Sequence, residues 1–256
     1  MGLRRGISDA GGGGRVAQDR YLPWRDPGGR LEGGMMLTAL KEEVCEQNRE
    51  LPRNRLVAGS GDKVSGRDPD SGLVVIKPSG VKFSRLAPGR TVVVDLDGNV
   101  IDAKMKPSVG TGIHLCLYRP RPDVGGVCHA HSPYAWSFAA PGERIPAVLT
   151  PITHFLGRDV PCSRYAPQGE VDTGEAILEA ADGGMVALVK AHGVFTMGIS
   201  ATEATSVAMY IEEAAMTTHL AMLRGPVEEL GQEEIDRCHA WFRQDYGQMG
   251  HKKVSA

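Results

Sequence analysis

Hydrophobic residues recur along the chain with two different spacings, which predict two kinds of element. Leu37, Leu40 and Val44 are three or four positions apart, as on the buried face of an amphipathic helix. Continuous apolar runs bounded by glycine or proline are instead typical of buried strands. Strands are expected within 72–80, 90–101, 124–131 and 183–198, and helices within 36–51, 110–122, 201–223 and 231–248.

One turn signal indicates how the strands are arranged. The pair Asp97-Gly98 separates the apolar run 92–96 from Val100-Ile101, which is the pattern of a β-hairpin. At least these two strands therefore run antiparallel. Because helices and strands otherwise alternate, and no repeat marks a second unit, we expect one α/β domain. Its central sheet is predicted to be mostly antiparallel, with helices on both faces.

The two ends of the chain differ from this domain. Residues 1–34 are rich in glycine and arginine and have no apolar period, so we expect a disordered leader. This segment lacks the apolar stretch of a secretory signal. The folded domain is predicted over 35–250 and a short tail over 251–256. Whether the leader is part of the native protein stays open.

Composition and charge exclude several classes of partner. The 256 residues carry a formal net charge of −2, which gives no electrostatic reason to expect nucleic acid or an anionic membrane as a partner. No apolar run is long enough to predict a transmembrane helix. The five cysteines lack metal-finger spacing and are typical of reduced thiols, so a cytoplasmic location is expected.

The histidines carry the candidate chemistry. His129 and His131 are two residues apart at the end of an expected strand, so their side chains point to the same face. A catalytic zinc ion usually takes three protein ligands and keeps one open position. His192 follows another apolar run, and Gly193 beside it permits a sharp turn. The three residues are the candidate metal ligands, although a pair of hydrogen-bonded histidines explains the first two equally well.

Several motifs occur in an order that resembles one family. They are "VVIKPSGV", "VVVDLDGNVI", "VCHAHSPYA", "AHGVF" and "DYGQ", and they extend from about residue 36 to 248. In this order they resemble the class II aldolase/adducin superfamily, in particular its L-ribulose-5-phosphate 4-epimerases. The resemblance implies an α/β fold with an antiparallel sheet and a homotetramer whose active sites lie between subunits. It also implies that the three histidines bind a divalent metal, usually Zn²⁺, with Mn²⁺ or Fe²⁺ as alternatives.

The same resemblance implies a phosphate site. Its residues match Lys77, Ser79 and Gly80 in one loop and Ser108 in a second loop. Lys63 stands where the family has a substrate-binding asparagine. Its ammonium group either adds positive charge toward an acidic substrate or points into solvent.

The chain also departs from the family at its acid–base positions. Gly110 stands where the family has an acidic residue near the metal, and His154 stands where the epimerases carry a second aspartate as proton carrier. The partner tyrosine is present as Tyr246, which the resemblance places in a neighbouring subunit's site. For His154 three readings stay open: a proton carrier, a fourth metal ligand, or a residue of a site that has lost its activity.

The resulting hypothesis is a divalent-metal-dependent epimerase or aldolase that acts on a small phosphorylated sugar. In this family a metal stabilises the enediolate that forms when a carbon–carbon bond breaks. One alternative keeps the scaffold and changes the metal chemistry, to that of a decarboxylase, a dehydratase or an iron-dependent oxygenase. A second alternative is a non-catalytic binding module.

Overall fold

The computed structural model describes residues 37–57, 59–167 and 169–245. The expected leader 1–34 and tail 251–256 lie outside the described residues, as does Tyr246. None of the helices in the described ranges has the length and hydropathy needed to cross a bilayer.

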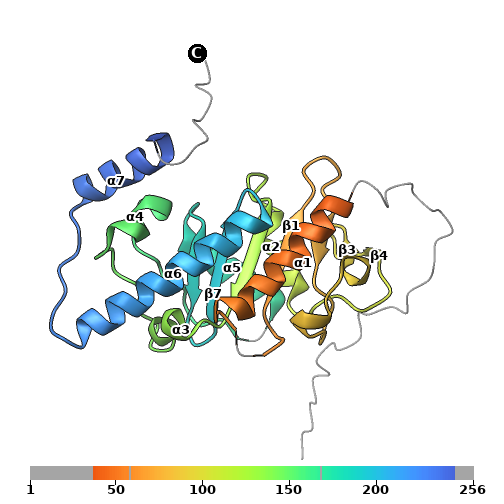
Figure 1. Cartoon of the computed structure of the whole chain (residues 1–256), viewed down its shortest axis with the longest axis horizontal. Helices are drawn as coiled ribbons and strands as arrows, with labels where there is room; N and C mark the ends of the chain where they lie inside the picture. The colour runs from red at the N-terminus through yellow and green to blue at the C-terminus, as the bar shows by residue number, and fades with distance from the viewer. Residues whose placement is uncertain (1–36, 58, 168, 246–256) are drawn as a thin grey trace, which may run out of the picture. The chain divides into compact units, whose positions relative to one another are not determined.

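A seven-stranded antiparallel sheet forms the centre of the described part of the chain (Figure 1). Its strand order is β4-β3-β2-β1-β5-β7-β6, and each pairing is antiparallel. The predicted mostly antiparallel sheet is therefore confirmed. The strands are β1 (Lys63–Arg67), β2 (Val74–Ile76), β3 (Val92–Val94), β4 (Val100–Asp102), β5 (Gly126–Ala130), β6 (Val186–Val189) and β7 (Gly193–Gly198).

Helices cover both faces of this sheet, as the sequence predicts. Figure 1 shows α1 and α6 crossing in front of the strands, with α2 and α5 behind them. The α-helices are α1 (Thr38–Arg53), α2 (Thr111–Tyr118), α3 (Pro133–Ala139), α4 (Thr150–Leu156), α5 (Glu170–Ala181), α6 (Ala201–Met222) and α7 (Gln232–Asp245). Two short 3₁₀ turns, η2 (Phe83–Arg85) and η3 (Pro88–Arg90), follow β2.

The alternation of side chains along each strand divides the core into two layers. On β2, Val75 packs with α1 and α6, whereas Val74 and Ile76 pack with α2 and α5. On β5, Cys128 belongs to the first layer and Val127 to the second. This is the two-residue period of a strand buried on both faces, and it explains why these strands appear as continuous apolar runs. By the same period, His129 lies on the α2 and α5 side.

The sequence between 183 and 198 forms two strands, which corrects the single strand expected there. Strands β6 and β7 are antiparallel neighbours joined by a tight turn at Lys190, Ala191 and His192. Both strands are buried on both faces and are mostly apolar, so the pattern hides the break between them. Helices α3, α4 and α5 and strand β1 were also not expected from the apolar pattern.

Candidate metal centre and phosphate loops

Three histidines meet where β5 ends and β7 begins. The β5–β7 ladder pairs Ala130 with Val194, so His131 just after β5 lies close to His192 just before β7. The ring centroid of His129 lies 4.6 Å from that of His131 and 5.0 Å from that of His192. One nitrogen from each ring lies within 4.8 Å of the other two. The structure thus brings together the three residues that the sequence nominates as metal ligands.

The central histidine is buried without a hydrogen-bond partner. His129 is 3 % exposed and stacks on Phe195, with ring centroids 4.1 Å apart. Among the described residues neither of its ring nitrogens has a hydrogen-bond partner. A buried polar group without a partner costs about 1–3 kcal/mol, which a bound cation would offset. The residues present therefore fit a divalent metal.

Burial also keeps two of these imidazoles in the form that binds metals. It lowers the pKa of His129 well below its ordinary value, and the nearby Lys63 ammonium acts in the same direction. Burial likewise lowers the pKa of His192, and the neighbouring His131 adds to this effect. Both rings are consequently neutral near pH 7, with a free lone pair for a cation.

The turn that presents His192 does not use Gly193 for its bend. The positive φ falls on Ala191, at 59°, and the His192 amide donates to the carbonyl of Val189. Gly193 instead permits close approach of the chains. A Cβ atom there would be 2.7 Å from the carbonyl oxygen of Ala130 and 3.6 Å from Nε2 of His129.

A cavity of about 320 Å³ opens beside the three histidines. The other residues that line it come from three loops and the start of β1, and they are Ser60, Gly61, Lys63, Ser79, Gly80, Ser108 and Val109. Two of these loops are joined, because Pro78 pairs with Pro107 and the Ser79 amide donates to the carbonyl of Lys106 at 3.1 Å. The two serine-containing loops predicted to bind phosphate therefore lie side by side next to the three histidines.

Lys63 occupies the space above Gly110. Its Nζ donates to the carbonyl of Val109 at 2.8 Å and would be 3.2 Å from a Cβ atom at residue 110. Burial lowers the pKa of Lys63 to about 8, while the carboxylate of Asp62 acts in the opposite direction. An ammonium group, rather than an acid, thus faces the cavity here. Lys63 therefore lines the cavity instead of pointing into solvent, and its contact with an acidic substrate stays a prediction.

Lys77 lies under the loops rather than in the cavity. It is fully buried, donates from Nζ to the carbonyl of Ser60 at 2.8 Å, and lies over the ring of Phe83. These contacts connect two of the loops that line the cavity. In this chain Lys77 supports the phosphate loops, and the direct phosphate contact predicted for it stays a prediction.

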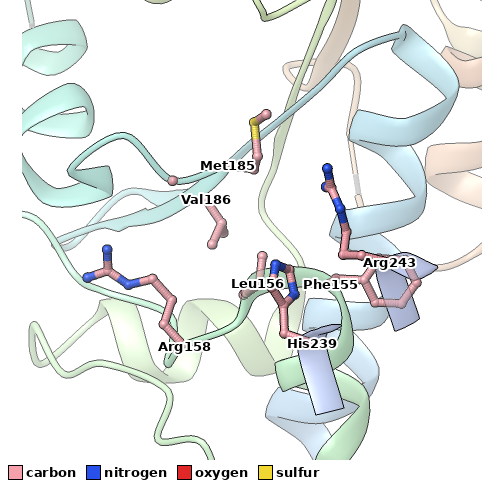
Figure 2. A pocket seen from close by; sticks show the side chains of 8 residues that line it. Phe155, Leu156, Arg158, Met185, Val186, His239 and Arg243 are labelled. Atoms are coloured by element: carbon pink, nitrogen blue, oxygen red, sulfur yellow. The ribbon is translucent and has the colours of Figure 1, made fainter. Parts of the chain in front are cut away.

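His154 is not brought to the three-histidine cluster of its own chain. It lies in α4, where its ring stacks on Phe242 of α7 with a centroid separation of 5.4 Å. His239 of α7 donates from Nδ1 to the carbonyl of His154 at 2.9 Å. A second pocket, of about 120 Å³, lies beside this contact. Figure 2 shows His239 beside Leu156, with Arg158 and Arg243 on opposite sides of it in this view.

Two acidic residues near the site were not expected from the sequence. Asp62 is 2 % exposed, and its Oδ1 forms a hydrogen bond with Nδ1 of His131. Glu170, in the first turn of α5, accepts the amide of Gly110 at 3.1 Å. The sequence gives a weak indication of Asp62, since this residue directly precedes the candidate site residue Lys63. The second comes from a segment 60 residues further along, which no local pattern connects to the site.

Comparisons with known proteins agree with this geometry. The sequence model described as "Class II Aldolase and Adducin N-terminal domain" matches residues 42–219 and therefore includes the three histidines. The chain belongs to the class II aldolase/adducin family. This confirms the resemblance that the sequence motifs indicate.

Relatives within the family include enzymes of sugar phosphates. The chain is 38% identical to the L-ribulose-5-phosphate 4-epimerase UlaF of Salmonella typhi over 195 residues, which are 71% of this chain and 85% of that protein. The structure of an L-fuculose 1-phosphate aldolase superposes with a TM-score of 0.77 at 28% identity, covering 80% of this chain and 97% of that one. The structure of YgbL from Klebsiella pneumoniae, a putative aldolase/epimerase/decarboxylase, has a TM-score of 0.71 at 26% identity, covering 78% and 97%.

Proposed function

We propose that this chain is a divalent-metal-dependent epimerase or aldolase that acts on a small phosphorylated sugar, with Zn²⁺ as the preferred ion. The single observation that carries the proposal is the cluster of three imidazoles at one end of a cavity whose other end is formed by two serine-containing loops. Its 38% identity to an L-ribulose-5-phosphate 4-epimerase supports the same substrate class.

The chain's own residues divide into two groups in this proposal. His129, His131 and His192 hold the cation, which when bound supplies Lewis-acid stabilisation of negative charge on a substrate oxygen. The hydroxyl groups of Ser79 and Ser108, the amide of Gly80 and the ammonium of Lys63 bind and orient the phosphate. The distance between the two groups then selects a substrate with its reacting carbons and its phosphate at opposite ends.

The proton-transfer groups come from a neighbouring subunit in this proposal. Within one chain His154 stacks on α7 and does not line the cavity, and Gly110 provides no side chain that carries a proton. In the sequence Tyr246 directly follows the last residue of α7, the helix on which His154 stacks. A cytoplasmic homotetramer would bring this region to the metal centre of an adjacent subunit, with Tyr246 and His154 as the acid–base pair.

The experiment measures metal content and turnover together. Purified protein is analysed for bound metal and then assayed with L-ribulose 5-phosphate for its C4 epimer and with L-fuculose 1-phosphate for release of an aldehyde. We expect about one divalent ion per chain and turnover of at least one substrate. His192→Ala should remove both, whereas the matched variant His219→Ala, on α6 beside Tyr134, should keep both.

Two results would refute the proposal. Protein without bound metal, whose thermal midpoint does not respond to added zinc or manganese, would exclude a metal enzyme. Metal-loaded protein that turns over neither substrate but consumes oxygen or releases carbon dioxide would assign other metal chemistry to the same scaffold.

A further inference from the structure

A buried carboxylate lies directly behind one of the three candidate ligands. Asp62 immediately precedes β1, and β1 pairs with β5 so that Lys63 lies opposite His129. This register places Asp62 next to the chain that leaves β5, where His131 is located. Its Oδ1 contacts Nδ1 of His131, and its side chain is 2 % exposed. A charged group buried to this extent needs a partner, and the imidazole N–H provides one.

The contact fixes which side of the His131 ring faces the cluster. With Nδ1 turned toward Asp62, Nε2 is the nitrogen available to the cation. His129 has no corresponding support, since neither of its ring nitrogens has a hydrogen-bond partner among the described residues. Its ring is held by stacking on Phe195 instead. His131 is therefore a ligand whose orientation depends on one identifiable carboxylate.

The charge of Asp62 also matters because none of the three candidate ligands carries a negative charge. The three ligands are imidazoles, and residue 110 is glycine. The other acid near this region, Glu170, is turned toward the amide of Gly110. Among the described residues, Asp62 is the acid whose carboxylate forms a hydrogen bond with the ring of a candidate ligand, His131.

We propose that Asp62 is a positioning residue for the metal centre, which orients His131 with Nε2 toward the cation and supplies the site with its negative charge. The inference rests on the proposed function, because it requires that the three histidines bind a metal. Carboxylates that accept the second N–H of a ligand histidine fix its ring and raise its basicity, and their loss typically weakens metal binding about 10- to 100-fold.

Zinc affinity separates this role from a purely structural one. Zinc dissociation constants are measured by competition with a chromophoric chelator for the wild type, Asp62→Ala, Asp62→Asn and Asp62→Glu. We expect Asp62→Ala to bind zinc about 10- to 100-fold more weakly. Asp62→Asn should lie between this variant and the wild type, since an amide oxygen accepts the same N–H without the charge. Asp62→Glu should recover part of the affinity.

Matched controls exclude general effects of charge and folding. Asp102→Asn removes one negative charge from β4, at the far edge of the sheet, and should leave zinc affinity unchanged. The thermal midpoint of each metal-free variant is measured in parallel. A structural role for Asp62 would lower this midpoint and leave the zinc affinity of the folded protein unchanged, and that outcome overturns the inference.

A measurement on the wild type keeps the inference testable if the variants do not fold. The long-range ¹H–¹⁵N spectrum of the zinc-loaded protein distinguishes the two nitrogens of each imidazole. We expect His131 to keep its proton on Nδ1 and to bind zinc through Nε2, and the reverse pattern overturns the inference. Wild-type protein that binds no zinc refutes the proposed function itself, whereas equal zinc binding by the wild type and Asp62→Ala refutes only the role of Asp62.

Discussion

Replacing Gly193 by alanine tests the close approach of β5 and β7 on which the three-histidine cluster depends. The added Cβ would lie 2.7 Å from the carbonyl oxygen of Ala130 and 3.3 Å from Cδ2 of His131. Non-bonded heavy atoms settle at roughly 3.5–4.0 Å for carbon, so the two strands must separate by about 0.5–1 Å. The nearest atom belongs to the backbone of a buried strand, which has little room to move.

The expected cost follows from overpacking of a buried site. Such substitutions typically destabilise a protein by about 1–3 kcal/mol. For a chain of this size each kcal/mol corresponds to about 2–4 °C in thermal midpoint, so a fall of roughly 2–12 °C is expected. Because Ala130 lies between His129 and His131, its displacement also moves two ligands. Zinc affinity should fall on the order of tenfold.

The assay combines calorimetry of the metal-free protein with a zinc titration. Gly89→Ala serves as the matched control, because a Cβ atom there meets open space and the backbone does not have a positive φ. The control should keep the wild-type midpoint or gain about 0.4–1 kcal/mol from the reduced entropy of its unfolded chain. If Gly193→Ala retained both the midpoint and the zinc affinity of the wild type, the proposed packing of β7 against Ala130 would be wrong.

Three further substitutions probe other features of the site. Gly110→Asp should lower the thermal midpoint of the metal-free protein, because φ at this residue is 85° and a side chain in the left-handed region costs about 1–2 kcal/mol; an unchanged midpoint would contradict this. Ala191→Gly relieves the same strain at a φ of 59°. Urea denaturation should show a free energy of unfolding raised by up to about 1 kcal/mol, with zinc binding retained. A lower free energy of unfolding would count against strain in this turn. Burial holds the pKa of His114 well below its ordinary value, so below about pH 6.5 the unfolded chain binds a proton that the folded chain does not. Below that pH, this residue should lower the free energy of unfolding by about 1.4 kcal/mol per pH unit. In denaturation measurements at several pH values, His114→Gln should therefore lose less stability with acid than the wild type. An equal loss of stability in the two proteins would refute this.

Much of the sheet was predictable because β2, β3 and β6 are apolar on both faces and because a recognisable turn joins β3 to β4. The Asp97-Gly98 hairpin required only local information, and Gly98 does have a positive φ of 93°. The boundary between β6 and β7 was hidden because its turn contains no glycine with positive φ, and Ala191 takes the left-handed conformation instead. Strand β1 was missed because Lys63, Ser65 and Gly66 interrupt its apolar pattern. Ser65 is buried against α2, where its hydroxyl contacts His114 at 2.7 Å.

The candidate ligands could be named from the sequence, whereas how they meet and what surrounds them depends on the register of the sheet. The period of a strand places His129 and His131 on one face, but only the pairing of Ala130 with Val194 shows that His192 meets them. The sequence does not indicate whether a lysine after a strand lines the cavity or lies buried under the loop that follows. Lys77 has its ammonium on the carbonyl of Ser60, 17 residues earlier in the chain. Such contacts depend on which loops are neighbours in space.

The pair Asp62-Lys63 gives the site a charge balance that neither residue type predicts by itself. In the proposed site no ligand carries a negative charge, so a bound divalent cation would keep its full charge, and Lys63 adds a further positive charge on the side of Gly110. Asp62 lies behind His131, Glu170 at the amide of Gly110 and Lys77 under the loops. The two acids balance the two lysines, so a site that held a divalent cation would carry a net charge of about +2. A sugar phosphate brings about −1.5 to −2 at pH 7, which matches this value. Loss of Asp62 would therefore lower the affinity for the cation and raise the affinity for phosphate. Loss of Lys63 would raise the affinity for the cation and lower the affinity for phosphate. The two neighbours act on different ligands because one lies behind the imidazoles and the other faces the cavity.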